Sequence, residues 1–131
     1  MPVSVTKTAG GTAEITWEAS DDPHGWLARA VESDELAYAM EAFGDGQAEQ
    51  DTTRSEEAAL QAAYFTTRLA KRMERQAAKQ VVRLRDDYGL SWRRIAEAVH
   101  GDGDKHSTVR RQYEAGRRAI GLPVAPPENE I

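Results

Sequence analysis

Cysteine is absent from this chain of 131 residues, and long apolar runs are absent as well. Without cysteine the protein can form neither a disulfide nor a thiolate metal site. The apolar runs span only a few residues, whereas a membrane-spanning helix needs about 20. The first residues also lack the apolar segment of a signal peptide. These absences lead us to expect a cytoplasmic protein without membrane contact.

Cations are scarce in the first half of the chain. Residues 1–66 carry only Lys7, Arg29 and Arg54 against thirteen acidic residues, a net charge of −10. Residues 67–118 carry fourteen Lys and Arg against seven acids, a net charge of +7, within a chain of net charge −5. A basic block confined to one region favours a nucleic-acid partner for that region. The alternative is that the two blocks attract each other and solvate the fold.

The usual signatures of catalysis and cofactor binding are also missing. The chain contains no G-x-S-x-G nucleophile elbow, no G-x-x-x-x-G-K-S/T phosphate loop and no G-x-G-x-x-G dinucleotide loop. The neighbouring acids Asp86 and Asp87 stand beside arginines near a predicted helix end, where we expect a surface role. We therefore expect no enzymatic activity and no cofactor.

The N-terminal residues alternate in polarity and predict a β-hairpin. Residues 3–8 and 12–18 read as half-buried strands with a pair of glycines between them. A two-residue turn would set Val5 opposite Thr16, whereas a three-residue loop sets Val5 opposite Ile15. The second register is favoured because it gives one apolar face. Since an isolated hairpin is marginally stable, we expect a helix or a partner chain to cover this face.

Two short helices are predicted next. The first begins at about Pro23 behind two aspartates, and the second begins after Ser33 and ends at Gly44. Residues 44–51 are polar and predict a linker. The apolar side chains that we expect these helices to bury are Trp26, Leu27, Ala30 and Val31 in the first, and Leu36, Ala37, Met40 and Phe43 in the second.

The longest helical pattern covers residues 54–88, where apolar residues recur every three or four positions. Thr53 and Glu56 form a capping box at its start, and Gly89 ends it. One helix of this extent would be roughly 52 Å long, so a break near Gln76 is left open. The apolar stripe is either ordinary core or a dimerisation seam.

Residues 89–121 read as a helix, a glycine-rich turn and a second helix. The predicted core has Ile95, Ala96 and Val99 in the first helix and Val109 in the second, since a small alanine lets the two helices approach closely. This stretch resembles the helix-turn-helix DNA-binding superfamily, especially small bacterial regulators and the promoter-reading region of sigma factors. The resemblance covers the last third of the chain. It implies a three-helix unit whose first helix is residues 77–88.

The resemblance also implies a DNA-contacting surface. Ser91 should cap the first helix, and the second helix, from Ser107 to about Arg118, should enter the major groove. The turn between them is about three residues longer than in the compact motif. Its histidines and aspartates could suggest a metal site, but their spacing fits ordinary turn chemistry, so no metal is expected. The predicted DNA contacts are Ser91, Trp92, Arg93, Arg94, Lys105, His106, Ser107, Thr108, Arg110, Arg111, Gln112, Arg117 and Arg118, whereas Val109, Tyr113, Ala119 and Ile120 should face inward.

The sequence thus predicts a mainly α protein with an N-terminal β-hairpin, a long central helix and a C-terminal helix-turn-helix. Residues 1–50 would form an acidic dimerisation or partner module, residues 51–121 the DNA-binding part, and residues 122–131 a flexible tail. The expected function is sequence-specific binding of double-stranded DNA in bacterial transcription regulation or a phage- or plasmid-linked process. The protein would act as a homodimer through the long helix or the N-terminal half. The alternative is an adaptor whose helix-turn-helix is structural and whose acidic half binds a partner protein.

Overall fold

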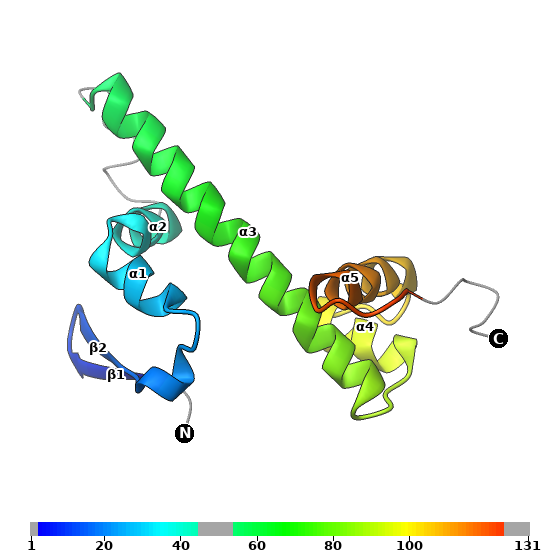
Figure 1. Cartoon of the computed structure of the whole chain (residues 1–131). Helices are drawn as coiled ribbons and strands as arrows, with labels where there is room; N and C mark the ends of the chain where they lie inside the picture. Colours follow the sequence, from blue (N-terminus) through cyan, green and yellow to red (C-terminus); the bar gives the residue numbers. More distant parts are fainter. Residues whose placement is uncertain (1–2, 45–53, 125–131) are drawn as a thin grey trace. The chain divides into compact units, whose positions relative to one another are not determined.

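The computed structural model of the protein describes residues 3–44 and 54–124. These residues form an N-terminal β-hairpin followed by five α-helices, so the protein is mainly helical as predicted (Figure 1). In the described part of the chain, no helix combines the length and apolar character needed to cross a membrane. Contacts within the chain define two compact units, Met1–Leu69 and Ala70–Ile131, and the division falls inside the long helix α3 (Glu56–Asp86).

The hairpin consists of β1 (Ser4–Ala9) and β2 (Thr12–Thr16), and a short 3₁₀ helix, η1 (Ala19–Asp21), follows it. Val5 pairs with Ile15, which confirms the register that places the apolar side chains on one face. Val5 is nevertheless 69% exposed. The expectation that a helix covers this face is therefore wrong at Val5, and cover by a partner chain stays a prediction.

The turn of the hairpin differs from the predicted three-residue loop. Ala9 pairs with Thr12, so only Gly10 and Gly11 lie between the strands. The register shifts between Lys7 and Ala9, because β1 contains an irregularity that takes up one residue. The extra residue that the loop prediction assigns to the turn therefore lies in the strand. Gly11 has a φ of 79°, a left-handed backbone that glycine adopts without strain.

The first two helices are α1 (Trp26–Glu32) and α2 (Glu35–Gly44). The predicted start of α1 at Pro23 is wrong, because the Asp22 carboxylate caps a helix that begins later. Two backbone N–H groups of the first turn of α1 each donate to this carboxylate at 3.0 Å. These bonds hold the pKa of Asp22 below its ordinary value. The start of α2 is confirmed, since the Oγ of Ser33 accepts the N–H of its first residue at 3.2 Å.

The apolar faces predicted for α1 and α2 are buried only in part. Ala30 is buried as expected, but Val31 is 42% exposed. On α2, Met40 is 54% exposed and Phe43 is 88% exposed. The residue that α2 does bury is Glu35, at 1% exposure. The predicted inward face of α2 is therefore wrong.

An ion pair and an aromatic contact explain which face α2 turns toward α3. The buried Glu35 carboxylate lies 3.2 Å from the Nε of Arg68 on α3. Beside this pair, the rings of Tyr38 and Phe65 stack with their centroids 5.9 Å apart. Because a buried carboxylate is costly to leave unpaired, this contact overrides the local apolar pattern of α2.

The long helix α3 begins at Glu56, where the Ser55 Oγ accepts a backbone N–H of the first turn at 3.1 Å. Thr53 of the predicted capping box lies outside the described residues. The helix continues without interruption for 31 residues, so it has no break near Gln76. It ends before Tyr88, which is 66% exposed and does not belong to the buried stripe.

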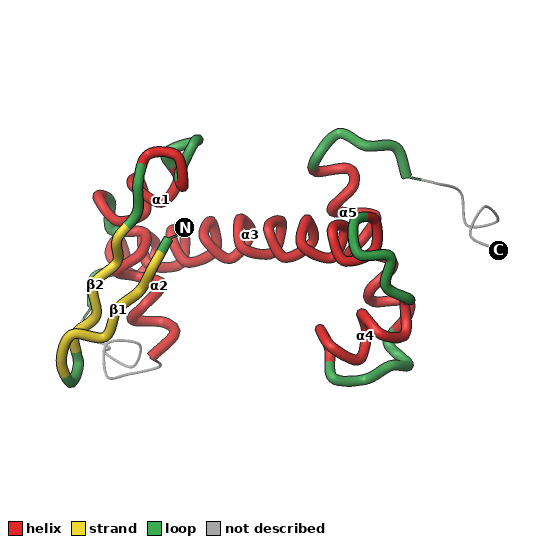
Figure 2. Tube along the Cα trace, turned by 90° about the horizontal axis from the view of Figure 1, so that it is seen from below, coloured by secondary structure: helices red, strands yellow, loops and turns green. Residues whose placement is uncertain are grey.

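In the second unit, α4 (Trp92–His100) and α5 (His106–Ala119) lie against the C-terminal half of α3 (Figures 1 and 2). Val99, which the sequence pattern places in the core, is 42% exposed, so the last turn of α4 extends beyond the core. The other core predictions are confirmed. The fully buried cluster takes residues from all three helices, namely Val81, Ile95, Ala96 and Val109.

The closest approach of α5 to α3 occurs at Gly116. A Cβ atom added at this buried glycine would lie 2.4 Å from the carbonyl oxygen of Ala78 and 2.7 Å from the Cγ2 of Val82. The prediction that Ala119 and Ile120 face inward is wrong, because both residues are exposed although they follow Gly116 by about one helical turn. Ile120 follows the end of α5 and is 45% exposed.

We predict that Gly116→Ala destabilises the protein. Glycine to alanine in an unconstrained helix stabilises by about 1 kcal/mol, but here the new Cβ overlaps backbone, and overpacking typically costs about 1–3 kcal/mol. Urea unfolding followed by circular dichroism measures the change. The control is Gly44→Ala on α2, where an added Cβ meets nothing within 4 Å. A Gly116→Ala variant as stable as this control would contradict the close approach.

Candidate nucleic-acid interface

The N-terminus of α4 is built as the sequence predicts. The Ser91 Oγ accepts the backbone N–H of Arg94 at 3.1 Å, which confirms Ser91 as the cap. The Arg94 side chain is exposed and pairs with no carboxylate among the described residues. Arg93 turns toward the loop, where its Nη1 lies 3.5 Å from the carboxylate of Asp104. Since both side chains of this pair are largely exposed, the pair is weak and a phosphate could displace Asp104.

The Trp92 side chain lies where α4 contacts α3 and α5. Its indole meets the ring of Tyr113 edge-on, with centroids 5.1 Å apart. The guanidinium of Arg85 lies over the indole at 4.3 Å, and that of Arg110 lies at 5.4 Å. The predicted contacts Trp92 and Arg110 therefore take part in packing α4 against its neighbours, Trp92 as the aromatic face and Arg110 as a cation over it.

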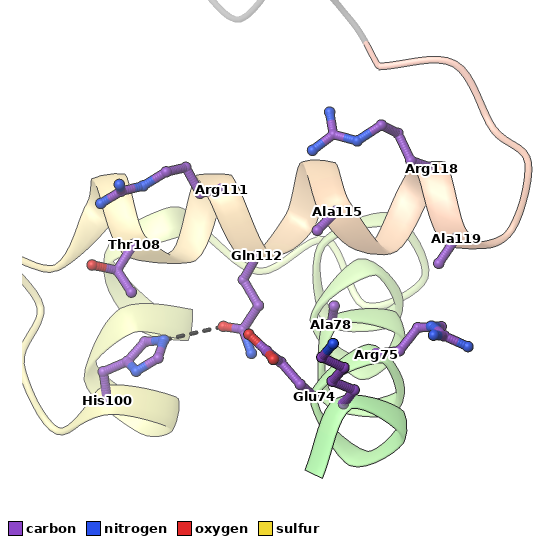
Figure 3. A pocket seen from close by; sticks show the side chains of 11 residues that line it. Glu74, Arg75, Ala78, His100, Thr108, Arg111, Gln112, Ala115, Arg118 and Ala119 are labelled. Carbon is purple, nitrogen blue, oxygen red and sulfur yellow. Dashed lines mark hydrogen bonds between the residues drawn. The ribbon is translucent and has the colours of Figure 1, made fainter. Parts of the chain in front are cut away.

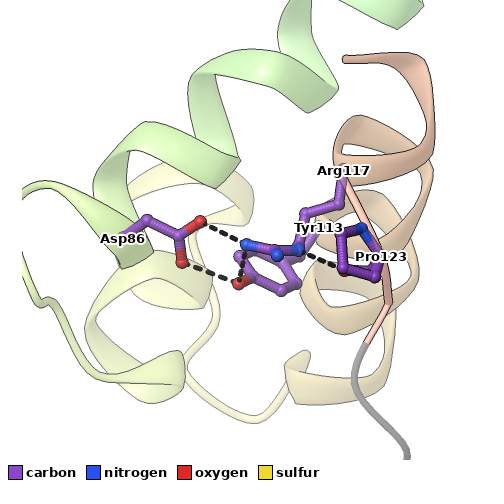
Figure 4. A network of polar contacts seen from close by, with 4 residues as sticks. All are labelled: Asp86, Tyr113, Arg117 and Pro123. Atoms are coloured by element: carbon purple, nitrogen blue, oxygen red, sulfur yellow. Dashed lines mark hydrogen bonds and ion pairs between the residues drawn. The ribbon is translucent and has the colours of Figure 1, made fainter. Parts of the chain in front are cut away.

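Arg117 is not directed outward, so its predicted orientation is wrong (Figure 4). Its Nη1 donates to the Asp86 carboxylate at 2.8 Å, and its Nε donates to the carbonyl of Pro123 at 2.7 Å. The Tyr113 hydroxyl donates to the other oxygen of Asp86 at 2.6 Å. This network ties α5 and the start of the tail to the end of α3. The signal was present in the sequence, because Arg117 follows the inward Tyr113 by one helical turn.

The turn between α4 and α5 uses its polar side chains internally. The Asp102 carboxylate accepts the backbone N–H of Asp104 at 2.9 Å. At the end of α4, the Nε2 of His100 lies 3.1 Å from the Oε1 of Gln112 and so holds that side chain. Within residues 3–44 and 54–124, no group of three or more His, Asp or Glu is arranged to hold a metal ion.

The start of α5 is open. Lys105, His106, Ser107 and Thr108 are all exposed. No side chain caps the first turn of α5, because Lys105 occupies the N-cap position. Uncapped backbone N–H groups therefore lie next to exposed hydroxyls and a cation in the sequence of the first turn, a combination that suits an anionic group.

A groove of about 750 Å³ runs between α3 and α5 (Figure 3). Of the predicted contacts it contains Thr108, Arg111, Gln112 and Arg118. The α3 residues of the groove, Lys71 and Arg75, are not among the contacts predicted from the sequence. Their spacing of four positions, which puts two basic side chains on one face of a helix, indicates such a surface. The lining residues are Lys71, Glu74, Arg75, Ala78, His100, Thr108, Arg111, Gln112, Ala115, Arg118 and Ala119.

No protein-family model, curated protein or solved structure matches this chain.

We predict that one tyrosine of the protein titrates above the usual range. Burial raises the pKa of Tyr113, and its hydrogen bond to the Asp86 carboxylate raises that pKa further. The folded protein therefore holds this proton more tightly than the unfolded chain. The stability that results is complete below the ordinary tyrosine pKa and is lost as the pH rises through the folded pKa.

Absorbance titration of tyrosinate tests this prediction in the intact protein and in Tyr113→Phe. The late-titrating component should disappear in Tyr113→Phe and persist in the control Tyr64→Phe, since Tyr64 is 58% exposed. Unchanged late titration in Tyr113→Phe would show that the network does not act on Tyr113.

Proposed function

We propose that the protein binds double-stranded DNA through α4 and α5, which act as a helix-turn-helix with α5 in the major groove. The observation that carries this proposal is the exposed face of α5. Thr108, Arg111 and Arg118 recur on it at intervals that keep them on one side of a helix. Arginine recognises guanine edges in the major groove, and threonine can bind phosphate or a base.

A rigid support for α5 favours this function. Val109 is fully buried in the core that joins the three helices, and Gly116 is held against α3. The Asp86 network fixes the far end of α5 through Arg117. A reading helix needs such a support, because base contacts depend on side chains that are held in position.

The available cations also favour DNA. Arg94 and Lys105 lie at the starts of α4 and α5, where helix N–H groups reinforce binding of a phosphate. Within the described residues, the one acceptor given for Arg111 is the carbonyl of Ser107 in its own helix, at 3.4 Å. These side chains are free to take phosphate or base edges of a duplex.

We further propose a homodimer, in keeping with a DNA site made of two half-sites. Leu60 and Tyr64 stand one turn apart on α3 and are 64% and 58% exposed. They are candidates for the seam. The second candidate function, an adaptor protein, is favoured by the exposed Met40 and Phe43 of α2, which a partner protein could cover.

The test is binding of the full chain to duplexes selected from a random library, measured by fluorescence anisotropy. We expect tight binding that weakens steeply between 50 and 200 mM salt, by about 10³-fold or more if about six phosphates are contacted. Arg111→Ala should cost about 1–3 kcal/mol on the selected duplex and relax its specificity.

The control is Arg83→Ala, which removes a cation of α3 that pairs with Asp87 at 3.6 Å and does not line the groove. It should bind nearly as the intact protein does. Absence of DNA binding at 50 mM salt, in a protein with its native circular dichroism, would rule out this function and leave the adaptor.

A further inference from the structure

We propose that the groove between α3 and α5 holds the sugar-phosphate backbone of the duplex, so that Lys71 and Arg75 of α3 are DNA contacts. This inference rests on the proposed function and extends its interface to a third helix. Neither residue belongs to the two helices that resemble a DNA-binding motif.

Cations are among the lining residues on both walls of this groove. Lys71 and Arg75 belong to α3, and Arg111 and Arg118 belong to α5. Figure 3 labels the last three of these side chains. Like charges four positions apart on one helix, as at Lys71 and Arg75, oppose helix formation by a few tenths of a kcal/mol. A cluster of this kind is accounted for when an anion lies between the walls.

The chain supplies little negative charge to this cluster. None of the four cations has an ion pair with a carboxylate in the described part of the chain. Glu74 is the one acid among the residues that line the groove. By contrast, other arginines of the described chain do form ion pairs with carboxylates, namely Arg54, Arg68, Arg83, Arg93 and Arg117.

The shape of the groove suits a polymer backbone. Its small side chains, Ala78, Ala115 and Ala119, bring no hydrogen-bonding groups of their own, so recognition falls to the cations and to the polar side chains around them. At about 750 Å³, the groove is larger than a single phosphate group needs. It is also continuous with the proposed reading face, because Thr108 and Arg111 belong to both. That continuity favours the phosphates of the same duplex over an acidic helix of a partner protein.

The experiment compares the double variant Lys71→Gln/Arg75→Gln with the intact protein on the selected duplex and on an unrelated duplex. Each lost phosphate contact should reduce the slope of log K against log salt by about 0.9. We therefore expect a slope smaller by about 2 and binding about 10- to 100-fold weaker at 0.1 M salt. The loss should be similar on both duplexes, because phosphate contacts carry no sequence information.

The matched control is Lys79→Gln/Arg83→Gln, which makes the same change of charge on α3 at positions that do not line the groove. Its slope should stay within a few tenths of that of the intact protein. If both double variants lose affinity and salt slope equally, the cause is the change in net charge, and the groove proposal is wrong.

The remaining outcomes distinguish failure of this inference from failure of the proposed function. If the intact protein binds DNA and the Lys71→Gln/Arg75→Gln slope is unchanged, the groove does not hold phosphate, and an acidic helix becomes its candidate ligand. If the intact protein binds no duplex at all, the proposed function fails and this inference fails with it. Circular dichroism should show native helix content for both variants, since Lys71 and Arg75 are exposed.

Discussion

The second unit depends on the close approach of α5 to α3 at Gly116. With no Cβ at this position, the α5 backbone reaches the carbonyl of Ala78, where any side chain would collide. This contact brings Arg117 within reach of Asp86 at the end of α3. It also sets the two walls of the basic groove opposite each other. One glycine thus determines both how the unit is held together and what its surface presents.

The arginines of this unit divide into two sets according to what surrounds them. Arg117 has two acceptors, Asp86 and the carbonyl of Pro123, and its side chain is 20% exposed, so it is part of the framework. Arg85 and Arg110 lie over the indole of Trp92 and are used in packing. The guanidiniums of the groove have neither an acid nor an aromatic face among the contacts described for them. A count of basic residues cannot separate these sets, because all of them contribute equally to the net charge.

The features that sequence predicts well are the local ones. Ser91 as a cap and the extent of α4 follow from neighbouring residues, and both are confirmed. The burial of Ile95 and Ala96 follows from helical periodicity, as does that of Val109 in the next helix. These predictions succeed because the residues concerned need only their own helix to define which side faces the core.

The predictions of side-chain direction that fail on α2 and α5 involve partners distant in the chain. The buried side of α2 is set by Glu35 and its ion pair with Arg68, which no local pattern announces. For Arg117, the spacing from Tyr113 indicates the inward side, but its partner Asp86 lies in another helix and is not identified by that spacing. The α3 wall of the groove exists only once α5 has docked. For the hairpin, the register follows from the apolar alternation, but the irregularity near Ala9 depends on how the backbone closes the turn.

The structure also bears on whether the basic block merely balances the acidic half of the chain. The basic block, residues 67–118, carries fourteen Lys and Arg against seven acids, and its Arg68 pairs with Glu35 of the acidic half. The ion pairs described for Arg83, Arg93 and Arg117 all use acids of this same segment, namely Asp87, Asp104 and Asp86. Because each of these three pairs joins a cation and an acid of the block, they leave its excess of seven cations unchanged. The excess gathers in part on one groove, where it raises the local potential more than the same charges would if dispersed. A concentration of charge of this kind favours an anionic partner over simple solvation of the fold.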